Sequence, residues 1–273
     1  MNWRAIWAIV RKDLKIVRQS KGVIIPLTVV PLILMVLVPA LAASLPWLAQ
    51  IPGNEQALRM ERYIQQMPDN LRVPLLAYNE TQRAVVLLVV YYLAPMYLVL
   101  PLMVASVVAA DSFAGEKERK TLEALLYTPT TDRELFVAKL LAAWIPAVAI
   151  AWIGFALYSV VVNWAAWPAM QQIFFPNAMW WVLALWVAPA VAGMGLGFTV
   201  MISVQVETFQ EAYQLGGVIV IPIIGLIVGQ AAGLLYFSPI PVFILGIAFW
   251  TIDAGLIWFG GRSFQRSELA QQI

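Results

Sequence analysis

Cysteine and histidine are both absent from this chain of 273 residues, and charged residues are scarce, at 12% of the sequence. Their absence excludes thiol nucleophiles, disulfides, Cys/His metal sites, Cys/His haem ligation and histidine general bases. Soluble domains carry about a quarter charged residues, whereas this chain is 62% hydrophobic with a mean hydropathy of +0.81. The composition therefore indicates a polytopic membrane protein.

The sequence motifs of several enzyme classes are missing as well. No P-loop of the form Gly-x-x-x-x-Gly-Lys-Ser/Thr occurs, and neither does the Gly-x-Ser-x-Gly elbow of serine lipases. The glycines at 193, 195 and 197 lie inside an apolar run rather than between a strand and a helix, so they do not form a nucleotide-binding loop. We therefore expect that this chain is not an enzyme and does not hydrolyse nucleotide by itself.

Six apolar segments are long enough to cross a bilayer, for which about 20 mostly apolar residues are needed. Because backbone polar groups must be satisfied within lipid, these segments are expected to be helices. They cover residues 22–48, 84–110, 135–162, 179–204, 215–236 and 239–261. The sequence thus predicts an all-α membrane protein, a single domain of residues 1–273 with six transmembrane helices.

The distribution of basic residues predicts that both termini are cytoplasmic. With the N-terminus inside, 13 of the 17 Lys and Arg residues fall on the cytoplasmic side, and four arginines fall in an external segment, residues 50–83. This asymmetry satisfies the positive-inside rule for a protein of the plasma (cell inner) membrane. A cleaved signal peptide ending near Ala42 is the alternative, but the basic region and the apolar run are both too long for one.

Residues 1–21 predict an amphipathic helix that lies in the membrane interface before the first span. Its apolar stripe consists of Trp3, Trp7, Val10, Leu14 and Val17, and four cations lie on the opposite side. In the interface the stripe would enter the acyl boundary while the cations face anionic headgroups. Packing of the stripe on the protein itself is the alternative.

The external segment contains the pattern of a second amphipathic helix, with Ala57, Met60, Ile64 and Met67 on one side and Pro68 at the end. Such a helix would rest on the outer surface or cover the mouth of a pathway. Three pairs match the pattern of a helix N-cap before the second, third and fifth spans. These pairs are Asn79 with Gln82, Thr131 with Glu134, and Thr208 with Glu211.

Two features inside the spans suggest specific roles. Asp253 is the only acid deep within a predicted span, so it either lines a polar pathway or couples an ion, or it is a structural carboxylate that is protonated or hydrogen-bonded. Gly225, Gly229 and Gly233 form a small-x-x-x-small stripe in the fifth span. Such a stripe favours close helix packing, within the subunit or between subunits.

Residues 111–139 form a charged island between the second and third spans. Eleven charged residues fall in this island, five basic and six acidic. Glu116 and Lys120 are spaced for a helical ion pair, and a leucine ridge follows them. The ridge consists of Leu122, Leu125 and Leu126. We predict a short amphipathic helix parallel to the membrane, whose balanced charge suits a protein groove better than anionic lipid.

The string from Phe113 to Pro129, FAGEKERKTLEALLYTP, followed by Glu134 and Lys139, resembles the inner loop of type-2 ABC transporter permeases. Bacterial permeases of the sodium- and drug-export kind are the nearest members. The N-terminal helix, the six-span plan and residues 210–215 before the fifth span agree with this resemblance. The chain departs from many relatives in its short external segment and in the short turn around Ser238, which leaves little room for a re-entrant segment.

The resemblance implies the permease subunit of an ATP-binding cassette exporter. It implies a second permease copy or a relative, and two separate ATPase subunits that hold the ATP and Mg. The first part of the island, residues 111–134, would be the coupling-helix region, which is seated in the ATPase. Its contacts would be Glu116, Glu118, Thr121, Leu122, Glu123, Leu125 and Leu126.

We further expect membrane lipids as partners, no nucleic acid, and no metal or cofactor in this chain. A membrane anchor that recruits an ATPase without transport is one alternative function, and an integral-membrane enzyme that modifies lipids is another. The sequence does not identify a substrate.

Overall fold

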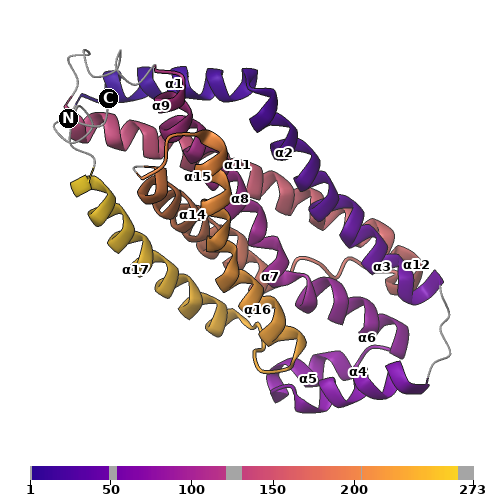
Figure 1. Ribbon diagram of the computed structural model, residues 1–273. Helices are drawn as coiled ribbons and strands as arrows, with labels where there is room; N and C mark the ends of the chain where they lie inside the picture. The colour runs from indigo at the N-terminus through magenta and orange to yellow at the C-terminus, as the bar shows by residue number, and fades with distance from the viewer. Residues whose placement is uncertain (1, 49–53, 121–130, 204, 264–273) are drawn as a thin grey trace.

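The computed structural model describes residues 2–48, 54–120, 131–203 and 205–263, and within these ranges it contains helices and no strands (Figure 1). Six helical stretches are long and apolar enough to span a membrane, which confirms the six predicted spans. They are Gly22–Pro46, Glu80–Glu118, Asp132–Ala165, Ala178–Ser203, Phe209–Ala231 and Pro239–Gly260. The helix α1 (Trp3–Gln19) lies at one end of the bundle, while α4 (Asn54–Gln66) and α5 (Asp69–Leu76) lie at the other. We refer to these as the α1 end and the α4 end.

The helix α1 packs on the protein with a face that the sequence predicted only in part. The Asn2 side chain caps it by accepting from the backbone N–H groups of Arg4 and Ala5. Of the predicted stripe, Val10 and Val17 are buried where α1 packs on the first and third spans, whereas Trp3 and Trp7 are exposed. The stripe is therefore divided, because its second half covers protein and only its tryptophans are free to enter the membrane interface.

The first span combines α2 (Lys21–Leu32), the π-helical turn η1 (Ile33–Leu37) and α3 (Val38–Leu48). The second span combines α6 (Glu80–Val86), η2 (Leu87–Tyr92), α7 (Ala94–Tyr97), α8 (Val99–Ala110), η3 (Asp111–Gly115) and α9 (Glu116–Glu118). It continues eight residues beyond its predicted end at 110. Residues 111–118 thus extend this span and do not form a separate helix along the membrane, because their acidic side chains find cationic partners close to the bundle.

The third span is α11 (Asp132–Ala165), followed by the short α12 (Trp167–Met170). The fourth span comprises α13 (Ala178–Val182), η4 (Leu183–Val187) and α14 (Ala188–Ser203). The fifth span comprises α15 (Phe209–Gly216), the 3-10 turn η5 (Gly217–Val220) and α16 (Ile221–Ala231). The sixth span is α17 (Pro239–Ser263). Capping boxes at Asn79 and Thr131 and an N-cap at Thr208 begin the second, third and fifth spans, as predicted.

The helix α14 lies at the centre of the bundle, where it packs against α8, α11 and α17. Its three glycines make these contacts possible, because each faces a neighbouring helix at very short range. A Cβ atom on Gly195 would lie 2.8 Å from the carbonyl oxygen of Leu102 in α8, and one on Gly197 would lie 2.8 Å from Leu256 Cβ in α17. Close helix packing in this protein therefore uses the fourth span.

The predicted glycine stripe of the fifth span does not pack two helices of this chain together in the part that is described. Nothing lies within 4 Å of a Cβ placed on Gly225, and one on Gly229 would meet Leu235 of the turn that follows. Gly233 has a φ of +72° and lies just beyond α16, where the chain reverses. The left-handed backbone suits glycine, so Gly233 terminates the helix.

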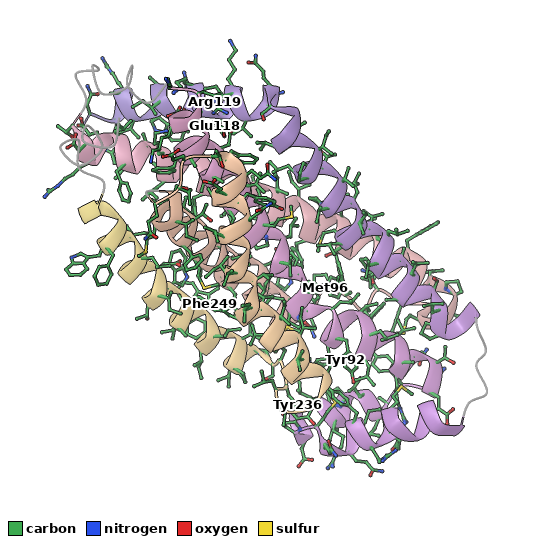
Figure 2. All side chains as sticks on the ribbon, viewed as in Figure 1. Tyr92, Met96, Glu118, Arg119, Tyr236 and Phe249 are labelled. Carbon is green, nitrogen blue, oxygen red and sulfur yellow. The ribbon has the colours of Figure 1, made fainter. Side chains whose placement is uncertain are left out.

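At the α4 end, the second amphipathic helix predicted from the sequence is confirmed as α4, and it covers the second and fifth spans. The Tyr63 hydroxyl donates to the Gln230 carbonyl oxygen at 2.9 Å. The Tyr63 ring lies 5.2 Å from that of Tyr92 and 5.6 Å from that of Tyr236. Ile64 of α4 and Met67, which directly follows the helix, are also buried. Figure 2 shows Tyr92 and Tyr236 toward this end of the bundle. Aromatic contacts, this hydrogen bond and an ion pair between Glu61 of α4 and Arg83 of α6, 3.8 Å apart, therefore hold α4 in place.

Candidate functional site

Four charged side chains from three elements meet at the α1 end, beside the segment that joins the second and third spans. They are Lys12 and Asp13 of α1, Glu116 of α9 and Lys139 of α11, and we call them the charge junction. Two are basic and two are acidic, so the junction is neutral when all four are ionised. A neutral group of close ion pairs is one way to place charge in a protein interior.

Glu116 is the centre of the charge junction. One of its oxygens accepts from Lys12 Nζ at 2.7 Å and the other from Lys139 Nζ at 2.6 Å. Lys139 also donates to the Ser112 carbonyl oxygen at 2.5 Å, and its Nζ lies 5.3 Å from the centroid of the Phe113 ring. Because Lys139 has no exposed surface, these contacts replace the water that its ammonium group loses.

Asp13 completes the junction from α1. One oxygen lies 3.3 Å from Lys12 Nζ, and the other lies 3.9 Å from Lys139 Nζ. Burial raises the pKa of the Asp13 carboxyl above its usual value, and Glu116 adds to this effect, while the two lysines oppose it. For Lys12, burial would lower the pKa, but the bond to Glu116 raises it. Lys12 therefore remains a cation, and Asp13 holds its proton to a higher pH than an exposed aspartate.

The residues after Glu116 connect the same end of the second span to the start of the fifth. Lys117 Nζ donates to the Val206 carbonyl oxygen at 3.2 Å, and Glu118 accepts from the backbone N–H of Phe209 at 2.9 Å. A carboxylate at the first turn of α15 also interacts favourably with the helix dipole. Arg119 in turn pairs with the buried Asp111 at 2.9 Å. Figure 2 shows Glu118 and Arg119 at the α1 end.

The beginning of the third span is fixed to α1 as well. Glu134 accepts from the backbone N–H of Thr131 at 3.1 Å, in the capping box, and from the backbone N–H of Asn2 at 2.5 Å. The helix of the second span ends where Lys120 takes a left-handed φ of 55°. Both flanks of residues 121–130 are thus attached to the bundle, and a displacement of that segment would act on α1, α11 and α15 together.

The predicted site residues fall in different environments. Glu118 is exposed, whereas Glu116 is 2% exposed and bound by two lysines. The remaining predicted contacts lie outside the described residues. These are Thr121, Leu122, Glu123, Leu125 and Leu126. Asp253 is buried in α17, away from the charge junction.

Sequence reasoning missed the parts that Lys12, Asp13 and Lys139 play in the junction. Lys139 gave the clearest signal, because a lysine eight residues into an apolar helix requires an anionic partner. Asp13 gave another, since it is the one acid in a basic N-terminal helix. Neither signal names a partner, because residues 13, 116 and 139 are distant in sequence and only the fold brings them together.

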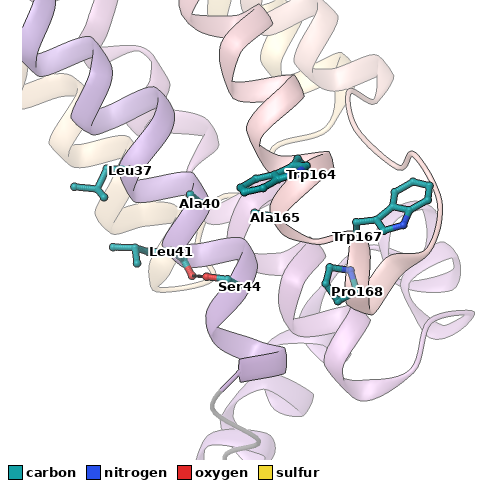
Figure 3. A pocket seen from close by; sticks show the side chains of 8 residues that line it. All are labelled: Leu37, Ala40, Leu41, Ser44, Trp164, Ala165, Trp167 and Pro168. Atoms are coloured by element: carbon teal, nitrogen blue, oxygen red, sulfur yellow. Dashed lines mark hydrogen bonds between the residues drawn. The ribbon is translucent and has the colours of Figure 1, made fainter.

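A groove of about 480 Å³ lies among α3, the end of α11 and α12 (Figure 3). Its lining is apolar apart from Ser44, whose hydroxyl donates to the Leu41 carbonyl oxygen at 3.2 Å. The described residues also contain no group of three or more acidic side chains that could hold a metal ion.

The family model for the ABC-2 family transporter proteins matches residues 7–247 of this chain. The chain belongs to the ABC-2 transporter family. The six candidate spans of this permease and its amphipathic helix α1 agree with a membrane subunit of an ABC transporter. No curated protein and no solved structure matches the permease.

Proposed function

We propose that the permease exports a substrate across the plasma (cell inner) membrane with energy from ATP that a separate ATPase subunit hydrolyses. The α1 end faces the cytoplasm in this proposal, since 13 of the 17 basic residues lie in the segments assigned to that side. ATP and Mg belong to two ATPase copies. The segment between the second and third spans, residues 119–131, is the docking site for one of them.

The observation that carries this proposal is the set of contacts on either side of residues 121–130. Glu116 is bound to α1 and α11, and Glu118 is bound to the start of α15. Glu134 holds the other flank to the first residues of the chain. Buried ion pairs are costly to break, so force on the loop moves these helices as a unit. A passive anchor would not require this connection between the loop and three elements of the bundle.

A second copy of the permease fits the fifth span in this proposal. Val218, Ile221, Gly225 and Val228 recur at helical spacing on one side, and the three larger residues are all exposed. Gly225 faces open space within the subunit. A small residue in an exposed apolar face lets another helix approach closely within lipid. Whether the partner is an identical copy or a paralogue depends on the genome that encodes it.

The docking site is tested with the variant Leu122→Asp/Leu126→Asp. Two buried charges would weaken an apolar interface by about 2 kcal/mol or more, so we expect the ATPase to be lost on co-purification while the permease still inserts. Val73→Asp is the control, because Val73 is exposed in α5 at the opposite end. Binding of the ATPase to the double variant at wild-type level would contradict the docking site.

Transport itself requires a second measurement. The permease and its ATPase are placed in lipid vesicles, and ATP hydrolysis and uptake of candidate substrates are followed together. ATP-dependent uptake supports the exporter, whereas stable binding of the ATPase without any substrate movement would identify a membrane anchor instead.

A further inference from the structure

Asp253 occupies the contact between α14 and α17, well separated from both ends of the sixth span. Its side chain is 1% exposed. It faces Gly193 of α14 so closely that a methyl group on this glycine would overlap the carboxyl group. Further along the same contact, Gly197 accommodates Leu256, and Phe249 is buried one turn before Asp253 (Figure 2). The carboxyl group is therefore packed within the contact between α14 and α17.

Nothing among the described residues compensates a charge on Asp253. Neither carboxyl oxygen has a hydrogen-bond partner, and the indole N–H of Trp250, one turn earlier, has none either. The elements that pack most extensively on α17 are α13, η4 and α14, and α11 also reaches it near Gly260. The helices α13 and α14 and the turn η4 contain no charged or titratable side chain, and the buried lysine of α11, Lys139, bonds to Glu116 instead. No lysine, arginine or second acid therefore lies on α13, η4 or α14 to pair with the carboxyl group.

An ionised carboxylate in this position would be unstable. Without a cation or a hydrogen-bond donor, a buried charge costs many kcal/mol, and the group becomes neutral instead. Contact between α14 and α17 therefore requires the protonated acid. Release of the proton to water, which leaves the carboxylate and a hydronium ion, requires that water reach the group. Water can reach it only if the two helices move apart.

We propose that Asp253 is a proton-binding site, occupied while α14 and α17 are in contact and vacated when they separate. The site is distinct from the charge junction, and the inference does not depend on the proposed ATPase partner. It makes separation of the fourth and sixth spans sensitive to pH, with higher pH favouring the separated state.

The first test is chemical. A hydrophobic carbodiimide adds to a protonated carboxyl group within the membrane, takes up its proton and leaves a stable N-acylurea that mass spectrometry detects. In phosphatidylcholine vesicles containing the full chain, we expect labelling of Asp253 that declines as pH rises. The peptide from Asp253→Asn should be unlabelled. If Asp253 is not labelled at any of the pH values, including the lowest, the proposal is overturned. Protection by sodium ions at constant pH would also overturn it, because the site would then be a cation site.

The second test measures separation of the helices. The chain has no cysteine, so Val200→Cys introduces a single thiol, at a buried residue of α14 whose side chain lies against Gly260 of α17. Its reaction with a water-soluble thiol reagent is compared in the Asp253 and Asp253→Asn backgrounds at each pH. Because the thiol is the same in both, any difference between them reports on Asp253.

We expect equal reaction rates at low pH and a several-fold faster reaction with Asp253 at high pH. Val89→Cys, at a buried residue of the second span, is the control and should react equally in the two backgrounds. If the Val200→Cys rates are equal at every pH, ionisation does not separate the helices and the proposal fails.

Discussion

At the scale of single residues, Lys139 is the side chain on which the charge junction depends most. It is completely buried and bonds to Glu116 and to the Ser112 carbonyl. Replacing it with methionine would leave Glu116 with Lys12 as its remaining lysine, and the loss of one partner of a buried pair costs about 3–5 kcal/mol. We expect Lys139→Met to lower the free energy of unfolding in detergent by about that amount.

The double variant Glu116→Gln/Lys139→Met separates pairing from simple loss of a side chain. It should recover most of the stability, since no uncompensated charge then remains in the junction. Arg72→Met is the control, because Arg72 pairs with Asp69 in an exposed position, where a pair contributes less than about 1 kcal/mol. Equal losses for Lys139→Met and Arg72→Met would show that the junction is not a stabilising pair.

Asp13 gives the junction a predictable response to pH. Burial raises its pKa in the folded protein above the ordinary value of 3.8. As pH rises past this value, the unfolded chain loses the Asp13 proton before the folded chain does, so stability falls with pH until the folded pKa is passed. The variant Asp13→Asn has no carboxyl group to titrate at this position. The thermal midpoint of the wild type should therefore fall relative to that of the variant as pH rises from 4 to 7. A difference between the two midpoints that does not change with pH would contradict the raised pKa.

At the scale of elements, α14 is a helix that tolerates little added volume. A Cβ on Gly195 would lie 2.8 Å from a backbone oxygen, which cannot move as a side chain can. We expect Gly195→Ala to destabilise the monomer by about 1–3 kcal/mol through overpacking. Gly225→Ala is the matched control, since nothing lies within 4 Å of the added methyl group. Chemical unfolding in detergent compares the two, and equal stability would show that α14 is not closely packed.

The elements that the sequence predicted well depend on local patterns. Apolar runs located the six spans, and short-range pairs such as Thr131 and Glu134 located helix starts, because a cap involves residues only three positions apart. The glycine spacing of the fifth span did not show what packs against it, because the same spacing occurs whether or not a helix of this chain lies opposite. Gly193 and Asp253 illustrate what local patterns cannot predict, since the contact between them arises only when the fourth and sixth spans are packed together.

At the scale of the whole molecule, the exposed face of the fifth span predicts the assembly of two copies. In vesicles, Val218→Cys should form a disulfide between copies, since Val218 lies on this face and is exposed. Adding Gly225→Trp should lower the yield several-fold by blocking close approach of the helices. Val160→Cys, on the exposed side of the third span, is the control. Cross-linking of Val160→Cys and Val218→Cys to the same extent would contradict the assignment of the face.

The α1 end and the α4 end of the molecule are each stabilised by a different kind of contact, and this difference has a kinetic consequence. Buried ion pairs join α1, α9 and α11 at one end, whereas the contacts of α4 at the other end include ring contacts, a neutral hydrogen bond and a partly exposed ion pair between Glu61 and Arg83, 3.8 Å apart. A neutral hydrogen bond contributes only about 1 kcal/mol. We therefore expect the α4 end to open more often than the α1 end, so that fluctuations of the bundle begin there rather than at its charged base.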